Sequence, residues 1–132
     1  MTLLMLFVFL FAIFEGGRLI QTQQALTDAA RIGTRRSITP LTATSILPAS
    51  GNVTSYVQQA LRGANLCNAC DASEGITITV EQNVCLSENE YSRITVTYPY
   101  HVMTLGMFGG ILNITLTGRS MMREETSHAT CP

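Results

Sequence analysis

The cysteines are the residues of this sequence with the clearest capacity for chemistry. Cys67 and Cys70 form a C-x-x-C motif, and Cys85 and Cys131 follow further along the chain. A C-x-x-C motif at the start of a helix lowers a thiol pKa and produces a redox nucleophile. Here the motif follows an expected helix and no helix begins at it, so a structural disulfide is favoured over a thiol oxidoreductase.

Four cysteines allow three disulfide pairings. In an antiparallel meander Cys85 and Cys131 lie at the same end of the sheet, whereas a strand of about eight residues places Cys67 and Cys70 roughly 27 Å away. We therefore favour Cys85 with Cys131 and Cys67 with Cys70. The main alternative pairs Cys67 with Cys85 and Cys70 with Cys131.

Other catalytic or ligand-binding patterns are weak. Cys67, Cys70, Cys85 and His128 form an imaginable zinc set, but no second paired motif supports it. His101 lacks a plausible nucleophile partner, and the sequence has no phosphate-binding glycine loop, H-E-x-x-H motif or serine nucleophile elbow. The sequence predicts a protein that is not an enzyme, with no catalytic residue, metal, cofactor or small-molecule substrate.

The composition is that of a small exported domain. Charged residues make up 13% of the chain, the net charge is -1, and Trp is absent. This offers no basic surface for a phosphate backbone, which argues against nucleic-acid binding. A small exported domain gains stability from disulfides.

The first fourteen residues, MTLLMLFVFLFAIF, carry no charge. As a helix they reach about 21 Å, short of the roughly 30 Å hydrocarbon core of a bilayer. No Lys or Arg precedes the segment and no small-x-small cleavage site follows it, so we expect it to stay in the mature protein. Glu15 follows this segment directly, and its carboxylate needs a partner at the edge of an apolar run. Arg18, on the same helix face, can supply it.

The helical pattern continues to Arg36 and contains a stripe of small residues. Ala25, Ala29 and Gly33 are spaced four apart and allow a close approach of another backbone. Two interpretations have equal weight: the stripe packs against the chain's own domain, or it packs against neighbouring copies of the helix.

The rest of the chain predicts a small head. An irregular Ser/Thr-rich connection over residues 37–51 is broken by Pro40 and Pro48. Asn52 can cap a second helix over residues 53–64. This helix has an apolar stripe, interpreted as core, of Val53, Tyr56, Val57, Ala60 and Leu61.

Three strands with alternating apolar and polar residues follow. The apolar faces are Ile76, Ile78 and Val80, then Ile94, Val96 and Tyr98, then Leu112, Ile114 and Leu116. The predicted fold is α+β, with a long apolar-to-amphipathic N-terminal helix, a short second helix and an antiparallel β-meander. The predicted domains are the helix at 1–36, whose apolar part is 1–14, a linker at 37–51 and an extracellular head at 52–132.

The N-terminal residues resemble the TadE-like pilins, in which an apolar helix is followed by Glu-x-Gly-Arg and an Ala-Arg-x-Gly-x-Arg segment. The matching positions are Glu15, Gly17, Arg18, Gln24, Ala25, Ala29, Ala30, Arg31, Gly33 and Arg35. A second match is ITVTYPYHVMTLGMF, whose strand ends at Tyr98–Pro99 in the family pattern, followed by a last strand closing near Met122–Arg123. Position five is Met5, where type IV-like prepilins usually carry Glu.

The resemblance implies a structural subunit of a tight-adherence, type IV-like pilus with a role in adhesion. Such a subunit is held in the inner membrane, handled by the pilus assembly machinery, and assembled into a homo-oligomeric extracellular filament. Glu15, Arg18, Ala25, Ala29 and Gly33 are then the candidate assembly residues. Two alternatives are a minor or priming pilin and a single-copy, membrane-anchored binding module. The apolar loop over residues 105–110 is either a contact between heads or packed against its own sheet, and the two interpretations have nearly equal weight.

Overall fold

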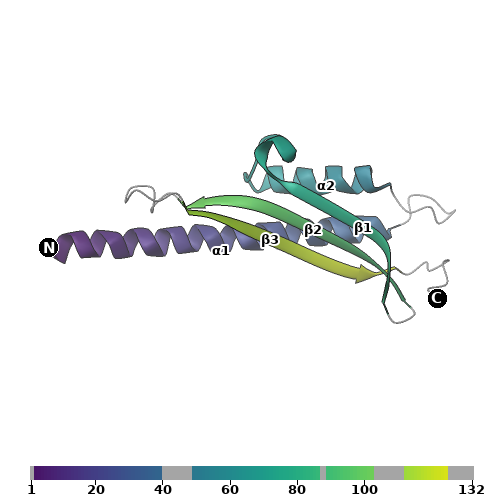
Figure 1. The fold of residues 1–132 in the computed structure, drawn as a ribbon, viewed down its shortest axis with the longest axis horizontal. Helices are drawn as coiled ribbons and strands as arrows, with labels where there is room; N and C mark the ends of the chain where they lie inside the picture. Colours follow the sequence, from purple (N-terminus) through teal and green to yellow (C-terminus); the bar gives the residue numbers. More distant parts are fainter. Residues whose placement is uncertain (1, 40–48, 87–88, 103–111, 125–132) are drawn as a thin grey trace.

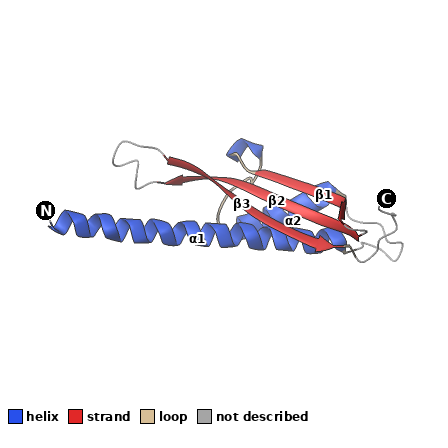
Figure 2. Cartoon of the chain, turned by 60° about the horizontal axis from the view of Figure 1, so that its bottom comes forward, coloured by secondary structure: helices blue, strands red, loops and turns tan. Residues whose placement is uncertain are grey.

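The structure is a computed structural model that describes residues 2–39, 49–86, 89–102 and 112–124. Its elements are, in chain order, α1 (Thr2–Ile38), α2 (Ser50–Gly63), the short 3-10 helix η1 (Ala72–Glu74), β1 (Thr77–Leu86), β2 (Asn89–Val102) and β3 (Leu112–Arg123). The three strands form one antiparallel sheet in the order β1-β2-β3, and α1 runs along it (Figures 1 and 2). The predicted α+β arrangement is confirmed.

Helix α1 is a single helix of 37 residues, about 56 Å long at 1.5 Å per residue. Its N-terminal part extends beyond the sheet, while its C-terminal part lies against the sheet and α2 (Figure 1). The helix passes through Gly16 and Gly17 without a break and continues two residues beyond the expected end at Arg36. It ends shortly before Pro40, which disfavours helical geometry in the residue that precedes it.

The alternating strand pattern is confirmed by burial. Ile94 and Val96 of β2 are fully buried, and Ile78 and Val80 of β1 are half-buried on the same face. The opposite face carries a row of threonines, because Thr77 pairs with Thr97 and Thr97 pairs with Thr117. The sheet therefore has one face toward the helices and one toward solvent.

Strand β2 does not end at Tyr98–Pro99, as the family pattern predicted, but continues to Val102. Pro99 pairs with Thr115 of β3, whereas the pairing with β1 reaches only to Thr97. A proline has no N–H to give to a ladder, so it fits a position where the strand has a neighbour on one side only. Gly75, with φ 74°, turns the chain beside this proline, and a Cβ there would lie 3.0 Å from the Pro99 ring.

The core lies between α1, α2 and the inner face of the sheet, and its fully buried side chains include Leu26, Val57, Leu61, Ile94 and Val96. Two expectations about α2 are wrong. The helix begins at Ser50 with Ala49 as its N-cap, so Asn52 lies in the first turn and does not cap it. Tyr56 is 36% exposed, and its ring lies 4.9 Å from the guanidinium carbon of Arg36 instead of in the core.

Two glycines let the elements approach closely. A Cβ on Gly118 of β3 would lie 2.5 Å from the backbone carbonyl carbon of Leu26 in α1. A Cβ on Gly33 of α1 would lie 2.4 Å from Val57 Cγ2 and 2.8 Å from Ile94 Cδ1. The packed half of α1 therefore contacts β3, α2 and β2 at distances that only glycine permits without a shift of the surroundings.

Two side-chain hydrogen bonds fix the same half of α1 along the sheet. Gln23 Nε2 donates to the carbonyl of Thr117 at 2.9 Å, and the hydroxyls of Ser37 and Ser92 lie 2.6 Å apart. Both serines are fully buried. These bonds set the register of α1 against β3 and β2, and so determine which part of the helix remains beyond the sheet.

Candidate functional site: the projecting half of the N-terminal helix

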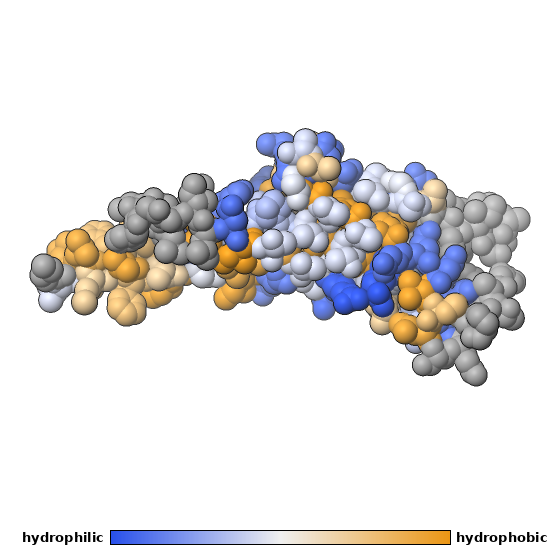
Figure 3. Space-filling view, in the orientation of Figure 1, coloured by the Kyte–Doolittle hydropathy of each residue, from blue (hydrophilic) through white to orange (hydrophobic). Residues whose placement is uncertain are grey.

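The large apolar side chains of α1 from Leu3 to Phe14 are exposed. Their exposed fractions run from 43% at Val8 to 70% at Met5, Phe9 and Ile13. In Figure 3 the visible part of this segment is mostly hydrophobic, whereas the head shows hydrophilic and hydrophobic areas side by side. A monomeric soluble protein rarely exposes an apolar surface of this extent, which marks it as a surface for a membrane or another protein.

In the described part of the chain, α1 is the one helix long and apolar enough to cross a membrane. Little of its apolar stretch is buried in the subunit. It is thus distinct from the core helix of a soluble protein, which would be mostly buried. An N-terminal apolar helix of this kind is consistent with membrane anchoring.

Glu15 marks the boundary between the projecting and packed halves of α1. It is 7% exposed, and its Oε1 accepts a hydrogen bond from the hydroxyl of Tyr100 in β2 at 3.1 Å. Burial raises the pKa of Tyr100 above its ordinary value, and the hydrogen bond to Glu15 acts in the same direction. The expected Glu15–Arg18 pair stays a prediction. Arg18 is exposed.

Gly16 and Gly17 follow this boundary. Among the residues that the structure describes, a Cβ built at either position meets no atom within 4 Å. Glycine in a helix interior costs roughly 1 kcal/mol relative to alanine. Packing against the described residues therefore does not require glycine at either position, in contrast to Gly33 and Gly118.

The small-residue stripe lies mostly inside the subunit. Ala29 is 3% exposed and Gly33 is buried against Val57 and Ile94, while Ala25 is half-buried. For Ala29 and Gly33 the structure corresponds to the interpretation in which the stripe packs against the chain's own domain. These two residues are unavailable to a neighbouring helix while the head is folded.

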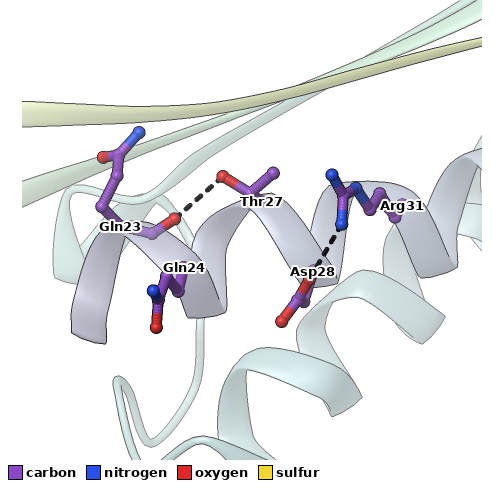
Figure 4. Close-up of a pocket in the computed structure, with 5 residues that line it drawn as sticks. All are labelled: Gln23, Gln24, Thr27, Asp28 and Arg31. Carbon is purple, nitrogen blue, oxygen red and sulfur yellow. Dashed lines mark hydrogen bonds and ion pairs between the residues drawn. The ribbon is translucent and has the colours of Figure 1, made fainter. Parts of the chain in front are cut away.

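The outer face of the packed half of α1 is polar. A shallow, open hollow there is lined by Gln23, Gln24, Thr27, Asp28 and Arg31 (Figure 4). Arg31 and Asp28 lie 3.6 Å apart in an exposed pair, and the Thr27 hydroxyl donates to the carbonyl of Gln23. Exposed pairs of this kind contribute little to stability. The arrangement has no convergent groups that would define a ligand site.

The C-x-x-C motif forms the predicted Cys67–Cys70 disulfide, with a Cα–Cα distance of 5.1 Å. The Glu74 carboxylate accepts hydrogen bonds from the backbone N–H groups of Asn68, Ala69 and Cys70 at 2.9–3.2 Å. These bonds, first that from Cys70, lower the pKa of Glu74 below its usual range. The motif therefore belongs to a loop held by a disulfide and a carboxylate.

Cys67, Cys70 and Glu74 place potential metal-ligand atoms within 4.8 Å of one another. Both sulfurs are in the disulfide, and a metal requires the thiolate form. The alternative pairing of Cys67 with Cys85 is wrong because Cys67 is bonded to Cys70. Cys131, His128 and residues 105–110 lie outside the described residues, so the Cys85–Cys131 pairing stays a prediction.

Three features that position the site were not predicted from the sequence: Tyr100 as a partner of Glu15, the Ser37–Ser92 contact, and the close approach at Gly118. A glycine inside a strand often marks a site where another backbone approaches closely, so the close approach at Gly118 could have been predicted from the sequence. The other two depend on which residues the register of α1 against the sheet brings together.

A small α+β head on a long helix with a projecting apolar half defines a pilin-like protein. The family model described as TadE-like protein matches residues 1–35. Neither a curated protein nor a solved structure matches the chain. The chain is TadE-like over this N-terminal segment, which confirms the resemblance and indicates a Tad pilus-associated, pilin-like protein.

Proposed function

We propose that this chain is a structural subunit of a tight-adherence pilus and that it polymerises through the projecting half of α1. The observation that carries the proposal is the exposure of the apolar side chains from Leu3 to Phe14 on a helix whose other half is built into the core. Burial of one such side chain is worth about 1.5–3 kcal/mol. A bundle of these helices would gain that free energy many times over.

Gly16 and Gly17 support close packing between helices. Small residues allow helix backbones to approach in an apolar environment, and neither glycine packs closely against another described residue. Before assembly the same apolar segment would lie in the inner membrane, where the pilus machinery would collect it. Arg18, exposed next to these glycines, would be available to pair with an acidic group of a neighbouring subunit.

The proposed division of the chain keeps a helix at 1–36, a connection at 37–51 and a head at 52–132. Residues 40–48 of the connection lie outside the described residues. By packing, the second half of α1 contributes Leu26, Ala30 and Thr34 to the head's core. The proposed extracellular unit therefore includes this half of α1.

The proposed function involves no catalysis, cofactor, nucleic acid or small-molecule substrate. TadE-like proteins are typically structural and non-enzymatic. The acidic and cysteine groups of the C-x-x-C loop are used in its hydrogen bonds and disulfide. Adhesion would then be a property of the assembled filament.

The proposal is tested by a matched pair of substitutions in one helix. Ile13 is 70% exposed in the projecting half and Ile32 is 46% exposed in the packed half. We expect Ile13→Asp to abolish filaments, because it buries an unpaired charge in the helix bundle, and Ile32→Asp to retain them. The measurement is electron microscopy of sheared filaments with mass spectrometry of their subunits, while circular dichroism verifies that both heads are folded.

Normal filaments from Ile13→Asp would contradict polymerisation through this surface. The stoichiometry of the chain in wild-type filaments separates a main building block from a minor or priming pilin. Its absence from filaments, with recovery in the membrane fraction, would favour the single-copy anchored module.

A further inference from the structure

Two glutamates face each other where β2 begins and β3 ends. Tyr91 pairs with Arg123, which places Glu90 directly opposite Glu124, and the N–H of Glu124 donates to the carbonyl of Glu90 at 2.9 Å. Glu90 shares its side of β2 with the buried Ser92 and Ile94. This end of the sheet is remote from the projecting half of α1 (Figure 1).

Both carboxylates are buried and incompletely satisfied. Glu90 is 3% exposed and Glu124 is 2% exposed. Glu90 Oε1 and Glu124 Oε2 are buried and accept no hydrogen bond in the part of the chain that the structure describes. The ion pairs between described residues, Arg31–Asp28 and Arg93–Glu81, involve neither glutamate. A buried carboxylate without such partners is costly.

A β-bulge brings the third strand into the same cluster. The β1–β2 register shifts between Glu81 and Val84, and Asn83 adopts a positive φ of 58°. The Asn83 N–H donates to Glu124 Oε1 at 3.4 Å. This hydrogen bond joins the end of β3 to the bulge of β1, with β2 between the two strands in the sheet.

Side chains that lie directly opposite each other on one face of an antiparallel pair have Cβ atoms about 4.5–5.5 Å apart, and two charged carboxylates so placed repel each other. A hard divalent cation removes this repulsion and uses the free oxygens, since calcium prefers carboxylate, carbonyl and water oxygens. From this arrangement we infer that Glu90 and Glu124 bind a divalent cation of the calcium type. The cation joins the ends of β2 and β3 and, through Glu124, the bulge of β1.

The ligand set predicts a weak site. Two protein carboxylates leave most of the coordination to water or carbonyl groups, which is typical of extracellular modules with dissociation constants of about 10⁻⁴–10⁻³ M. Such a site would be filled outside the cell, where this head is proposed to be displayed. Its role would be to stabilise the end of the head that lies farthest from the apolar helix.

The test uses the full chain in detergent micelles, with calcium chloride as the probe. Equilibrium dialysis should find one calcium ion per chain. At calcium tenfold above its dissociation constant, the thermal midpoint should rise by about 4–8 °C relative to chelator. Glu90→Gln and Glu124→Gln should each lose both the binding and the shift. The matched control is Glu81→Gln, an exposed glutamate on the other face of the same sheet, which should retain them.

The inference is overturned if the wild-type chain shows no calcium-dependent shift up to about 10 mM, above the weak end of extracellular sites. It is also overturned if Glu81→Gln loses the response as fully as the two buried positions do. Stabilisation by acid with no response to calcium would overturn it as well. If the Gln variants do not fold, the wild-type titration and the Glu81→Gln control still decide. Because the measurement is made on monomers, its failure leaves the pilus proposal untouched.

Discussion

The two halves of α1 differ in what lies against them. From Thr22 to Ser37 the helix buries a stripe at helical spacing that consists of Thr22, Leu26, Ala29, Ala30, Gly33, Thr34 and Ser37. From Leu3 to Phe14 its large apolar side chains are exposed. One continuous helix therefore serves the subunit's own core with one half and presents an apolar surface with the other.

The glycines make the same comparison at the level of single atoms. Gly33 and Gly118 leave no room for a methyl group, whereas no described atom lies within 4 Å of a Cβ added at Gly16 or Gly17. Close packing thus requires glycine in the packed half of α1, whereas no contact with the described residues requires it in the projecting half. This difference teaches that composition alone does not say which molecule a helix surface contacts.

The largest expected effect compares one methyl group in each half. Gly118→Ala should cost about 3 kcal/mol of unfolding free energy, because the new Cβ would meet the backbone of Leu26, which cannot move aside alone. Gly17→Ala should leave the head unchanged and stabilise α1 by up to about 1 kcal/mol. Urea denaturation measures both, and equal losses at the two sites would remove the distinction between the halves.

A slightly smaller effect is expected at Ala29, in the small-residue stripe. Ala29→Leu should destabilise the head by about 2 kcal/mol, since overpacking a filled core costs roughly 1–3 kcal/mol. This loss is expected if the stripe packs against the chain's own domain, because Ala29 is then part of the head's core. Lost filaments together with an unchanged urea midpoint would restore the interpretation of the stripe as a contact between subunits.

The boundary between the halves is tested at Tyr100. Tyr100→Phe removes the hydrogen bond to Glu15 and should cost about 1–2 kcal/mol, because it leaves a buried carboxylate with one donor fewer. The matched control is Tyr91→Phe on the outer face of the same strand, which should change the unfolding free energy by less than about 0.5 kcal/mol. A similar loss of unfolding free energy at both tyrosines would show that the Tyr100–Glu15 hydrogen bond does not stabilise the boundary between the halves.

The same tyrosine predicts an alkaline dependence. The pKa of Tyr100 is raised above its ordinary value of 10.0, so the folded state holds this proton more tightly than the unfolded state. Its contribution to stability is complete below pH 10.0 and is lost as the pH rises through the raised pKa. Unfolding curves measured from about pH 8 to about pH 11 span the ordinary pKa of tyrosine. The free energy of unfolding should fall over this range in the wild type, and it should fall less in Tyr100→Phe.

The smallest effect is expected on the outer face of the packed half. Asp28→Asn breaks the exposed pair with Arg31 and should change stability by about 0.3–0.5 kcal/mol, as for other exposed pairs along a helix. Repeating the measurement in high salt should abolish the difference because exposed charges are screened. A loss of unfolding free energy above about 1 kcal/mol would contradict the assignment of Asp28 and Arg31 to a solvent-exposed face.

Periodicity predicted the elements that bury a regular apolar face. The faces of β1 and β2, the stripe of Val53, Val57 and Leu61 in α2, and the continuous N-terminal helix were all readable from residue spacing. Boundaries were less accurate: β2 continues through Pro99 because only one side of it is paired there. Tyr56 lies at the edge of its stripe, where the ring packs against Arg36 instead of entering the core.

By itself the sequence determined the TadE-like apolar helix, the α+β class and the Cys67–Cys70 disulfide, because each rests on local spacing. Only the tertiary structure decided that Gly33 and Gly118 are close-approach sites, that Glu15 bonds to Tyr100 and that Glu90 meets Glu124. These contacts join residues far apart in the chain, and they depend on how α1 lies on the sheet and on the strand register. Local patterns choose the elements, whereas packing between the elements chooses the partners.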